Sequence, residues 1–150
     1  MGLTMRSREK NNVMIKTSTD KPQLIELPKI HDLRGNLTFI QHPDHLPFEI
    51  KRVFWIYDVP GGEKRGGHAS KKQHEVIISL SGSFDVIITL PNGTLKCFTL
   101  NRSYFGLYIP PLHWRHMENF STNSVSLHLC NDSFDEGDYL RELDSYLIPQ

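Results

Sequence analysis

The stretch that decides the fold is residues 62–82, which read GEKRGGHASKKQHEVIISLSG. Glycine, histidine, serine, glutamate and glycine recur in it with the spacing G-x5-H-x-S-x4-E-x6-G. His68 and Ser70 lie two apart, so on a strand both side chains point to one face. After a bend, Glu75 begins an apolar run that predicts the next strand, and its carboxylate can point into the same space. The pattern therefore predicts that these three side chains line one cavity.

Working outward from this stretch, short apolar segments alternate with turn signals along most of the chain. They are rich in Val, Ile, Phe and Tyr, and Pro91-Asn92-Gly93 is a strong hairpin signal because Asn and Gly tolerate positive φ. The segments predicted as strands are 24–27, 36–41, 50–59, 75–80, 84–90, 95–100, 103–109 and 124–130. Eight short strands at this spacing indicate an all-β sandwich or barrel.

The two ends of the chain do not follow this alternation of apolar segments and turn signals. Residues 1–20 are polar and predict a flexible arm, in which residues 13–16 (VMIK) form a possible short strand. Near the other end, Ser133 and Glu136 have the spacing of a capping box, and leucines then recur at i, i+3 and i+7. We therefore expect one α-helix over residues 134–147, packed on a single domain that spans residues 21–150.

Length and charge exclude several classes of protein. The chain has 150 residues, and 17 Lys and Arg balance 17 Asp and Glu. This charge balance does not favour binding to nucleic acid. No apolar run approaches the ~20 residues of a membrane span. The first residues lack the apolar core of a secretory signal. Two cysteines, Cys97 and Cys130, make no disulfide scaffold, so we expect a reduced cytoplasmic protein. From the charge balance and the short apolar runs, we expect neither a membrane nor a nucleic-acid partner.

The spacing in residues 62–82 resembles the first motif of the cupin barrel, with Ser70 where a second histidine is expected. A weaker echo of the second cupin motif runs from Gly106 through Pro110 and Pro111 to His116. This resemblance implies a jelly-roll barrel with one C-terminal helix. It also brings His116 toward the mouth beside His68.

A more specific resemblance covers residues 24–147 and is carried by six segments in order. The chain is similar in them to the dTDP-sugar 3,4-ketoisomerases. They are residues 32–37 (DLRGNL), 47–53 (PFEIKRV), 65–69 (RGGHA), 81–83 (SGS), 106–108 (GLY) and 135–139 (DEGDY). The resemblance implies a homodimeric isomerase, with N-terminal strands that the subunits can exchange. It implies conversion of dTDP-4-keto-6-deoxyglucose to a dTDP-3-keto-6-deoxyhexose, a step toward 3-amino deoxysugars, by proton transfer through an enediol and without a metal or other cofactor.

The chemistry implied by the resemblance assigns roles to particular residues. A proton carrier with a pKa near neutrality suits histidine, so His68 is the first catalytic candidate and Tyr57 the second. The diphosphate needs arginine, whose planar fork matches phosphate oxygens, and Arg34 and Arg65 are the candidates. The remaining substrate-binding candidates are the side chains at the other motif positions, Ser70, Glu75 and His116. The family tends to carry glutamine and glutamate at the last two.

Two alternatives to a metal-free isomerase follow from these departures. His68, Glu75 and His116 would make a set of two histidines and one carboxylate, which suits Fe(II) in a metal-dependent cupin. Alternatively, the serine at position 70 would leave a sugar-nucleotide-binding protein with impaired catalysis. Metal analysis separates the first alternative from an isomerase, and turnover separates the second.

Overall fold

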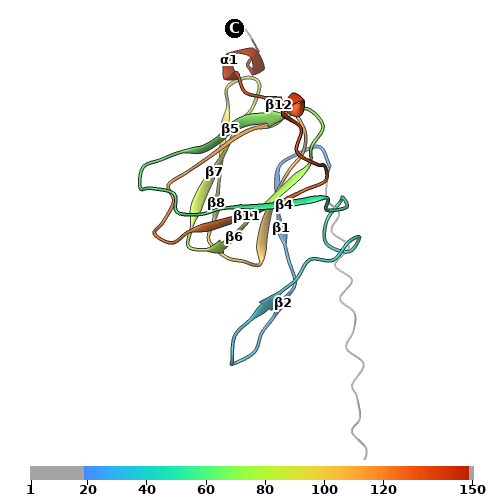
Figure 1. Cartoon of the computed structure of the whole chain (residues 1–150), viewed down its shortest axis with the longest axis vertical. Helices are drawn as coiled ribbons and strands as arrows, with labels where there is room; N and C mark the ends of the chain where they lie inside the picture. The colour runs from blue at the N-terminus through green and yellow to red at the C-terminus, as the bar shows by residue number, and fades with distance from the viewer. Residues whose placement is uncertain (1–18, 149–150) are drawn as a thin grey trace, which may run out of the picture.

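The structure is a computed structural model that describes residues 19–148. Most of the predicted arm, including the possible strand at residues 13–16, lies outside the described residues. The strands form two antiparallel five-stranded sheets that face each other as a jelly-roll barrel (Figure 1). The observed architecture confirms the all-β class predicted from the sequence.

The first sheet has the order β1 (Gln23–Glu26), β9 (Phe105–Ile109), β6 (Glu75–Ser81), β11 (Val125–Cys130) and β4 (Arg52–Ile56). The second sheet has the order β12 (Tyr139–Leu140), β5 (Arg65–Ser70), β10 (Trp114–Glu118), β7 (Phe84–Thr89) and β8 (Leu95–Leu100). A separate hairpin of β2 (Lys29–Ile30) and β3 (Leu37–Thr38) projects away from the barrel (Figure 1). The strand β10 was missing from the sequence-based prediction.

Alternation along the strands divides the apolar side chains between two cores. One core fills the barrel and includes Ile77, Val86, Leu107 and Met117, all nearly inaccessible to solvent. Fully burying side chains of this size contributes roughly 1.5–3 kcal/mol each. This apolar filling occupies much of the barrel, so the polar side chains inside it stand out.

The second core lies on the outer face of the first sheet. Val76 and Ile78 of β6 point outward there and pack with Leu46 and Phe48, which belong to the segment between β3 and β4. Both faces of β6 are therefore buried, which explains its nearly continuous apolar run. This outer core covers one side of the sheet that carries part of the candidate site.

Two glycines at the beginning of β5 determine how that strand pairs with β10. Gly66 and Gly67 have φ of 90° and 80°, a backbone conformation that side chains with a Cβ rarely adopt. The pairing shifts at this point, since His68 lies opposite Arg115 while Gly66 lies opposite His116. The bulge thereby pairs His68 with Arg115, on the same face of the second sheet.

The C-terminal segment differs from the predicted helix over residues 134–147. A 3-10 turn, η1 (Glu136–Asp138), is followed by β12 and by a helix of only four residues, α1 (Leu143–Tyr146). The predicted helix was too long because Tyr139 and Leu140 pair with Ser70 and Ala69 of β5, which takes their backbone into the sheet. Asp135, and not Ser133, caps the turn by accepting a hydrogen bond from the backbone N–H of Gly137.

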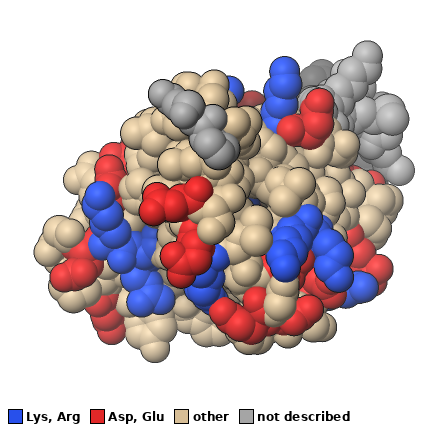
Figure 2. Space-filling model, turned by 90° about the horizontal axis from the view of Figure 1, so that it is seen from above, with Lys and Arg blue, Asp and Glu red and all other residues tan. Residues whose placement is uncertain are grey.

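The surface carries charges of both signs. On the face that Figure 2 shows, Lys and Arg side chains are interspersed with Asp and Glu. No helix within residues 19–148 is long and apolar enough to cross a membrane. Cys97 is an exposed thiol and Cys130 a buried one, and neither is in a disulfide.

Candidate active site

Three charged or titratable side chains from three strands meet inside the barrel. His68 comes from β5, Arg115 from β10 and Glu75 from the first position of β6. Arg115 Nη1 lies 3.4 Å from His68 Nε2 and 3.8 Å from Glu75 Oε1. Arg115 and Glu75 are only 1% and 2% exposed. The arginine therefore connects the predicted histidine and glutamate in a place that water hardly reaches.

This burial changes the acid–base properties of both titratable groups. Removal from water, together with the nearby Arg115 cation, lowers the pKa of His68 to about 4. Burial opposes ionisation of Glu75, but its contact with His128 and the Arg115 charge outweigh that effect and lower its pKa. At neutral pH the site therefore holds a neutral imidazole beside a buried carboxylate and guanidinium pair.

His128, which the sequence analysis did not select, adds a second buried imidazole. Its Nδ1 lies 3.5 Å from Glu75 Oε1, and its Nε2 lies 2.9 Å from the hydroxyl of Ser126. The ring stacks on Phe54, with centroids 4.3 Å apart. Alternation along β11 turns Ser126, His128 and Cys130 to the barrel interior. That alternation was the sequence signal that could have identified His128.

Tyr139 forms one wall beside His68, with ring centroids 4.7 Å apart. Arg52 Nη2 lies 3.0 Å from the Tyr139 hydroxyl and also donates to Gln73 Oε1 at 3.0 Å. These contacts join the C-terminal segment to β4. They hold the tyrosine ring against the histidine.

Several buried polar atoms at this end of the barrel have no hydrogen-bond partner among residues 19–148. They are Nε and Nη2 of Arg115, Nδ1 of His128, Nε and Nη1 of Arg52, Nε2 of Gln73 and Oγ of Ser70. Such unpaired groups are costly in a protein interior unless a ligand or water contacts them. Their concentration beside His68 is what a site for a polar ligand requires. Ser70 itself is fully buried and does not contact His68, Glu75 or Arg115 by a hydrogen bond.

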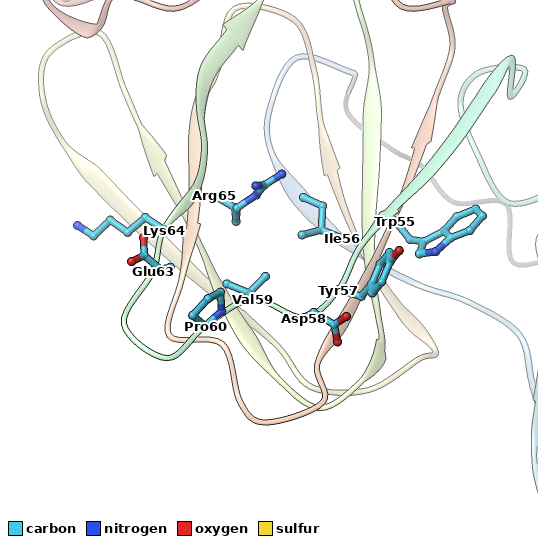
Figure 3. A pocket seen from close by; sticks show the side chains of 9 residues that line it. All are labelled: Trp55, Ile56, Tyr57, Asp58, Val59, Pro60, Glu63, Lys64 and Arg65. Carbon is cyan, nitrogen blue, oxygen red and sulfur yellow. The ribbon is translucent and has the colours of Figure 1, made fainter.

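A cavity of about 430 Å³ lies where β4 ends and β5 begins. Arg65 extends from β5 across this opening toward Ile56, whereas Lys64 points away from it (Figure 3). Tyr57, on the segment that follows β4, also lines the cavity and is largely exposed. His68 follows Arg65 by three residues on the same strand. The structure thus brings the predicted Arg65 and Tyr57 together at one opening.

Two predicted residues lie elsewhere. Arg34 sits at the exposed turn of the β2–β3 hairpin, where its guanidinium makes two 2.9 Å hydrogen bonds to Asp32. His116 points away from Arg115 on β10 and contacts Glu118 at 3.1 Å, in a cluster that includes Lys64. Neither side chain joins the buried group around His68 within this chain.

The metal-binding alternative requires His116 to converge with His68 and Glu75. The register of β10 places Arg115, and not His116, opposite His68. Within the described part of the chain, no three His, Cys, Asp or Glu side chains are grouped so that they could hold a metal ion. The donor set proposed for that alternative is therefore not brought together.

A jelly-roll barrel with a buried His–Arg–Glu group and an arginine at its opening belongs to the cupin class of small-molecule enzymes. The family described as "FdtA: WxcM-like, C-terminal" matches residues 20–149. The chain belongs to this family of TDP-sugar 3,4-ketoisomerases, as the resemblance in the sequence predicted.

The relatives include proteins with named activities. The chain is 40% identical over 124 residues to the TDP-4-oxo-6-deoxy-alpha-D-glucose-3,4-oxoisomerase of Aneurinibacillus thermoaerophilus, covering 83% of this chain and 88% of that one. It is similar to the 3,4-ketoisomerase QdtA of Thermoanaerobacterium thermosaccharolyticum, solved in complex with TDP (40% identity, TM-score 0.81, covering 84% and 91% of the two chains). The TDP-quinovose 3,4-ketoisomerase WlaRB of Campylobacter jejuni has 38% identity and a TM-score of 0.79, with 85% and 98% covered.

Proposed function

We propose that this chain is a 3,4-ketoisomerase that converts dTDP-4-keto-6-deoxyglucose to a dTDP-3-keto-6-deoxyhexose. Its single catalytic domain spans residues 21–150. The observation that carries the proposal is the buried group of His68, Arg115 and Glu75 inside a barrel whose relatives share this activity. One of these relatives, a variant of QdtA, was solved in complex with TDP-4-keto-6-deoxyglucose. dTDP and TDP are the same nucleotide.

The reaction needs only a few groups. The C4 carbonyl acidifies the C3 proton, whose removal gives an enediol, and a proton is then returned to C4. One group must move the proton, and another must donate a hydrogen bond to the oxygen on which charge develops. We propose that His68 and Tyr57 share these two roles, one side chain moving the proton and the other donating the hydrogen bond. The partly exposed His68, beside buried unpaired donors, supports the assignment for the histidine.

Arg65 is the proposed contact for the diphosphate. Its side chain crosses the opening of the 430 Å³ cavity without an ion-pair partner among the described acidic residues (Figure 3). A guanidinium matches the geometry of phosphate oxygens. The nucleotide would then lie at the opening while the sugar extends along β5 toward Ser70, Glu75 and His68.

A homodimer is part of the proposal. A second, largely apolar groove of about 550 Å³ lies between the β2–β3 hairpin and the outer face of the first sheet. Leu37 and Phe39 of the hairpin region remain substantially exposed beside it. A second copy would cover this surface, and exchange of N-terminal strands would carry Arg34 toward a neighbouring subunit. Light scattering that gives a 17.4 kDa monomer would contradict the dimer.

A place in the synthesis of 3-amino deoxysugars follows from the proposed product, because a 3-keto group is what an aminating enzyme would use. The two free thiols are consistent with a reducing, cytoplasmic compartment. His116 is given no direct role in this proposal, because it contacts Glu118 on the face of β10 opposite to that of Arg115.

Ser70, at the position where the resemblance leads one to expect a second histidine, favours one alternative, a protein that binds the nucleotide sugar without converting it. The test is incubation with dTDP-4-keto-6-deoxyglucose, NMR of the product, and calorimetry with dTDP. A new 3-keto sugar, lost in His68→Ala by ~10²-fold or more, is expected. Binding without turnover would favour the binding protein. Activity that disappears with a chelator and returns with Fe(II) would favour a metal enzyme.

A further inference from the structure

The contact between Arg115 and His68 constrains which imidazole nitrogen carries a proton. Arg115 Nη1 lies 3.4 Å from His68 Nε2. A guanidinium has only N–H donors and no acceptor. Nε2 must therefore accept the hydrogen bond with its lone pair. A neutral imidazole whose Nε2 is unprotonated carries its proton on Nδ1.

The charges around His68 favour this neutral form. Arg115 faces the ring from β10, Glu75 from β6 and His128 from β11, while Arg141 lies beyond Tyr139 on the C-terminal segment. Glu75, the buried anion among them, is shared with Arg115 and His128 at 3.8 and 3.5 Å, and the exposed Glu136 is a second anion that interacts with His68. Arg141 is paired with Glu136. A proton added at Nε2 would face the Arg115 cation directly.

The other ring nitrogen is available to a ligand. Nδ1 of His68 has no hydrogen-bond partner among residues 19–148, and it is not one of the buried polar atoms sealed from solvent. This nitrogen belongs to His68, which lies three residues after Arg65 on β5. A substrate oxygen would be the acceptor that this N–H lacks.

We infer that Arg115 is a positioning residue that holds His68 in the Nδ1–H tautomer, so that His68 enters the reaction as a hydrogen-bond donor to a substrate oxygen. This inference rests on the proposed ketoisomerase function. It assigns His68 to the stabilisation of the charge that develops on the substrate oxygen. Proton transfer is then left to Tyr57. Glu75 supports the arrangement by holding the guanidinium between the two sheets.

The direct test is ¹⁵N NMR of the eight histidine rings in the dTDP-bound wild type, with His68 assigned from its absence in His68→Gln. We expect a protonated Nδ1 and an unprotonated Nε2 at neutral pH. His113 supplies an internal reference, because its Nδ1 lies 2.9 Å from the carbonyl oxygen of Pro111 and must donate. An Nε2-protonated His68, or a cationic one, overturns the inference.

Two variants test the role of Arg115. Arg115→Met should give a mixture of the two His68 tautomers and raise the pKa of His68 from about 4 toward its usual 6.5. It should also lower kcat ~10-fold, at a KM within about threefold of wild type. Arg115→Lys, which restores a cationic donor, should recover the tautomer in part. Lys96→Met is the matched control, because it also removes a cation, but an exposed one on β8, at the far edge of the second sheet.

The outcomes separate the two proposals. An unchanged tautomer in folded Arg115→Met overturns the positioning role. If Arg115→Met does not fold, the wild-type spectrum alone decides. The expected tautomer in a protein that does not turn over the sugar contradicts the proposed function and leaves the tautomer assignment standing. Full turnover with the wrong tautomer contradicts the inference alone.

Discussion

Glu75 and Arg115 form an ion pair that joins the two sheets inside the barrel, with Oε1 and Nη1 3.8 Å apart. Both side chains are almost fully shielded from water. Burying two charges costs free energy that their attraction offsets only while both are present. The pair therefore makes the protein sensitive to the loss of either partner, and it links stability to the site that holds His68.

Glu75→Leu should be strongly destabilising, because it removes the carboxylate at similar volume and leaves the Arg115 cation buried without its partner. We expect a loss of about 3–5 kcal/mol in the free energy of unfolding, measured by urea denaturation. Glu136→Leu is the matched control, since its exposed pair with Arg141 should be worth at most about 1 kcal/mol. Equal losses in the two variants would contradict the account of the buried pair.

Stability should fall as the pH is lowered below neutrality. The pKa of His68 is about 4 in the folded protein and 6.5 in the unfolded chain, so the unfolded chain binds the extra proton between these values. The free energy of unfolding should therefore decrease from pH 6.5 to pH 4, by up to about 3 kcal/mol. The folded state also lowers the pKa of Glu75. Stability should therefore continue to fall as the pH drops below 4.5, the usual pKa of a glutamate.

Denaturation at a series of pH values measures this loss. His68→Asn should remove the larger part of the loss between pH 6.5 and pH 4, leave the smaller contribution of His74, whose pKa burial also lowers, and keep the lower part in place. His113→Asn, a substitution outside the buried group, should keep the wild-type profile. A flat wild-type profile over this interval would show that His68 is not held in its neutral form.

Arg65→Ala should weaken dTDP binding by ~10-fold or more, because a charge-assisted contact is worth ~1.5–3 kcal/mol. Isothermal titration calorimetry with dTDP measures the change. Lys96→Ala removes an exposed cation from β8, at the far edge of the second sheet, and should bind dTDP like the wild type. If Arg65→Ala retains full affinity, the diphosphate lies elsewhere, and Arg34 of a neighbouring subunit becomes the residue to test.

Most of the fold could be predicted from the sequence, because the strands have clear boundaries. The predicted segment 95–100 matches β8, and 124–130 contains β11. β10 was missed because Pro110 and Pro111 precede it and its charged residues conceal the alternation. The C-terminal helix was overestimated because pairing with β5 overrides the local helical pattern.

The site was predictable in part. His68 and Glu75 were selected from a spacing pattern, and the structure places both inside the barrel. Arg115 was not selected, because an arginine on a strand usually faces solvent. Its position beside the buried Met117, two residues along β10, was the available signal. His116 was selected instead, and the register of β10 turns it to the opposite face.

The central claim, proton transfer between C3 and C4 of a 4-keto sugar, is tested most directly by following the reaction in D₂O. Wild-type protein and dTDP-4-keto-6-deoxyglucose are incubated, and the product is analysed by ¹H and ¹³C NMR. We predict a dTDP-3-keto-6-deoxyhexose that carries solvent deuterium at C4, as an enediol intermediate requires when the catalytic groups exchange with water. A substrate spectrum that stays unchanged, with dTDP binding intact, would contradict the claim.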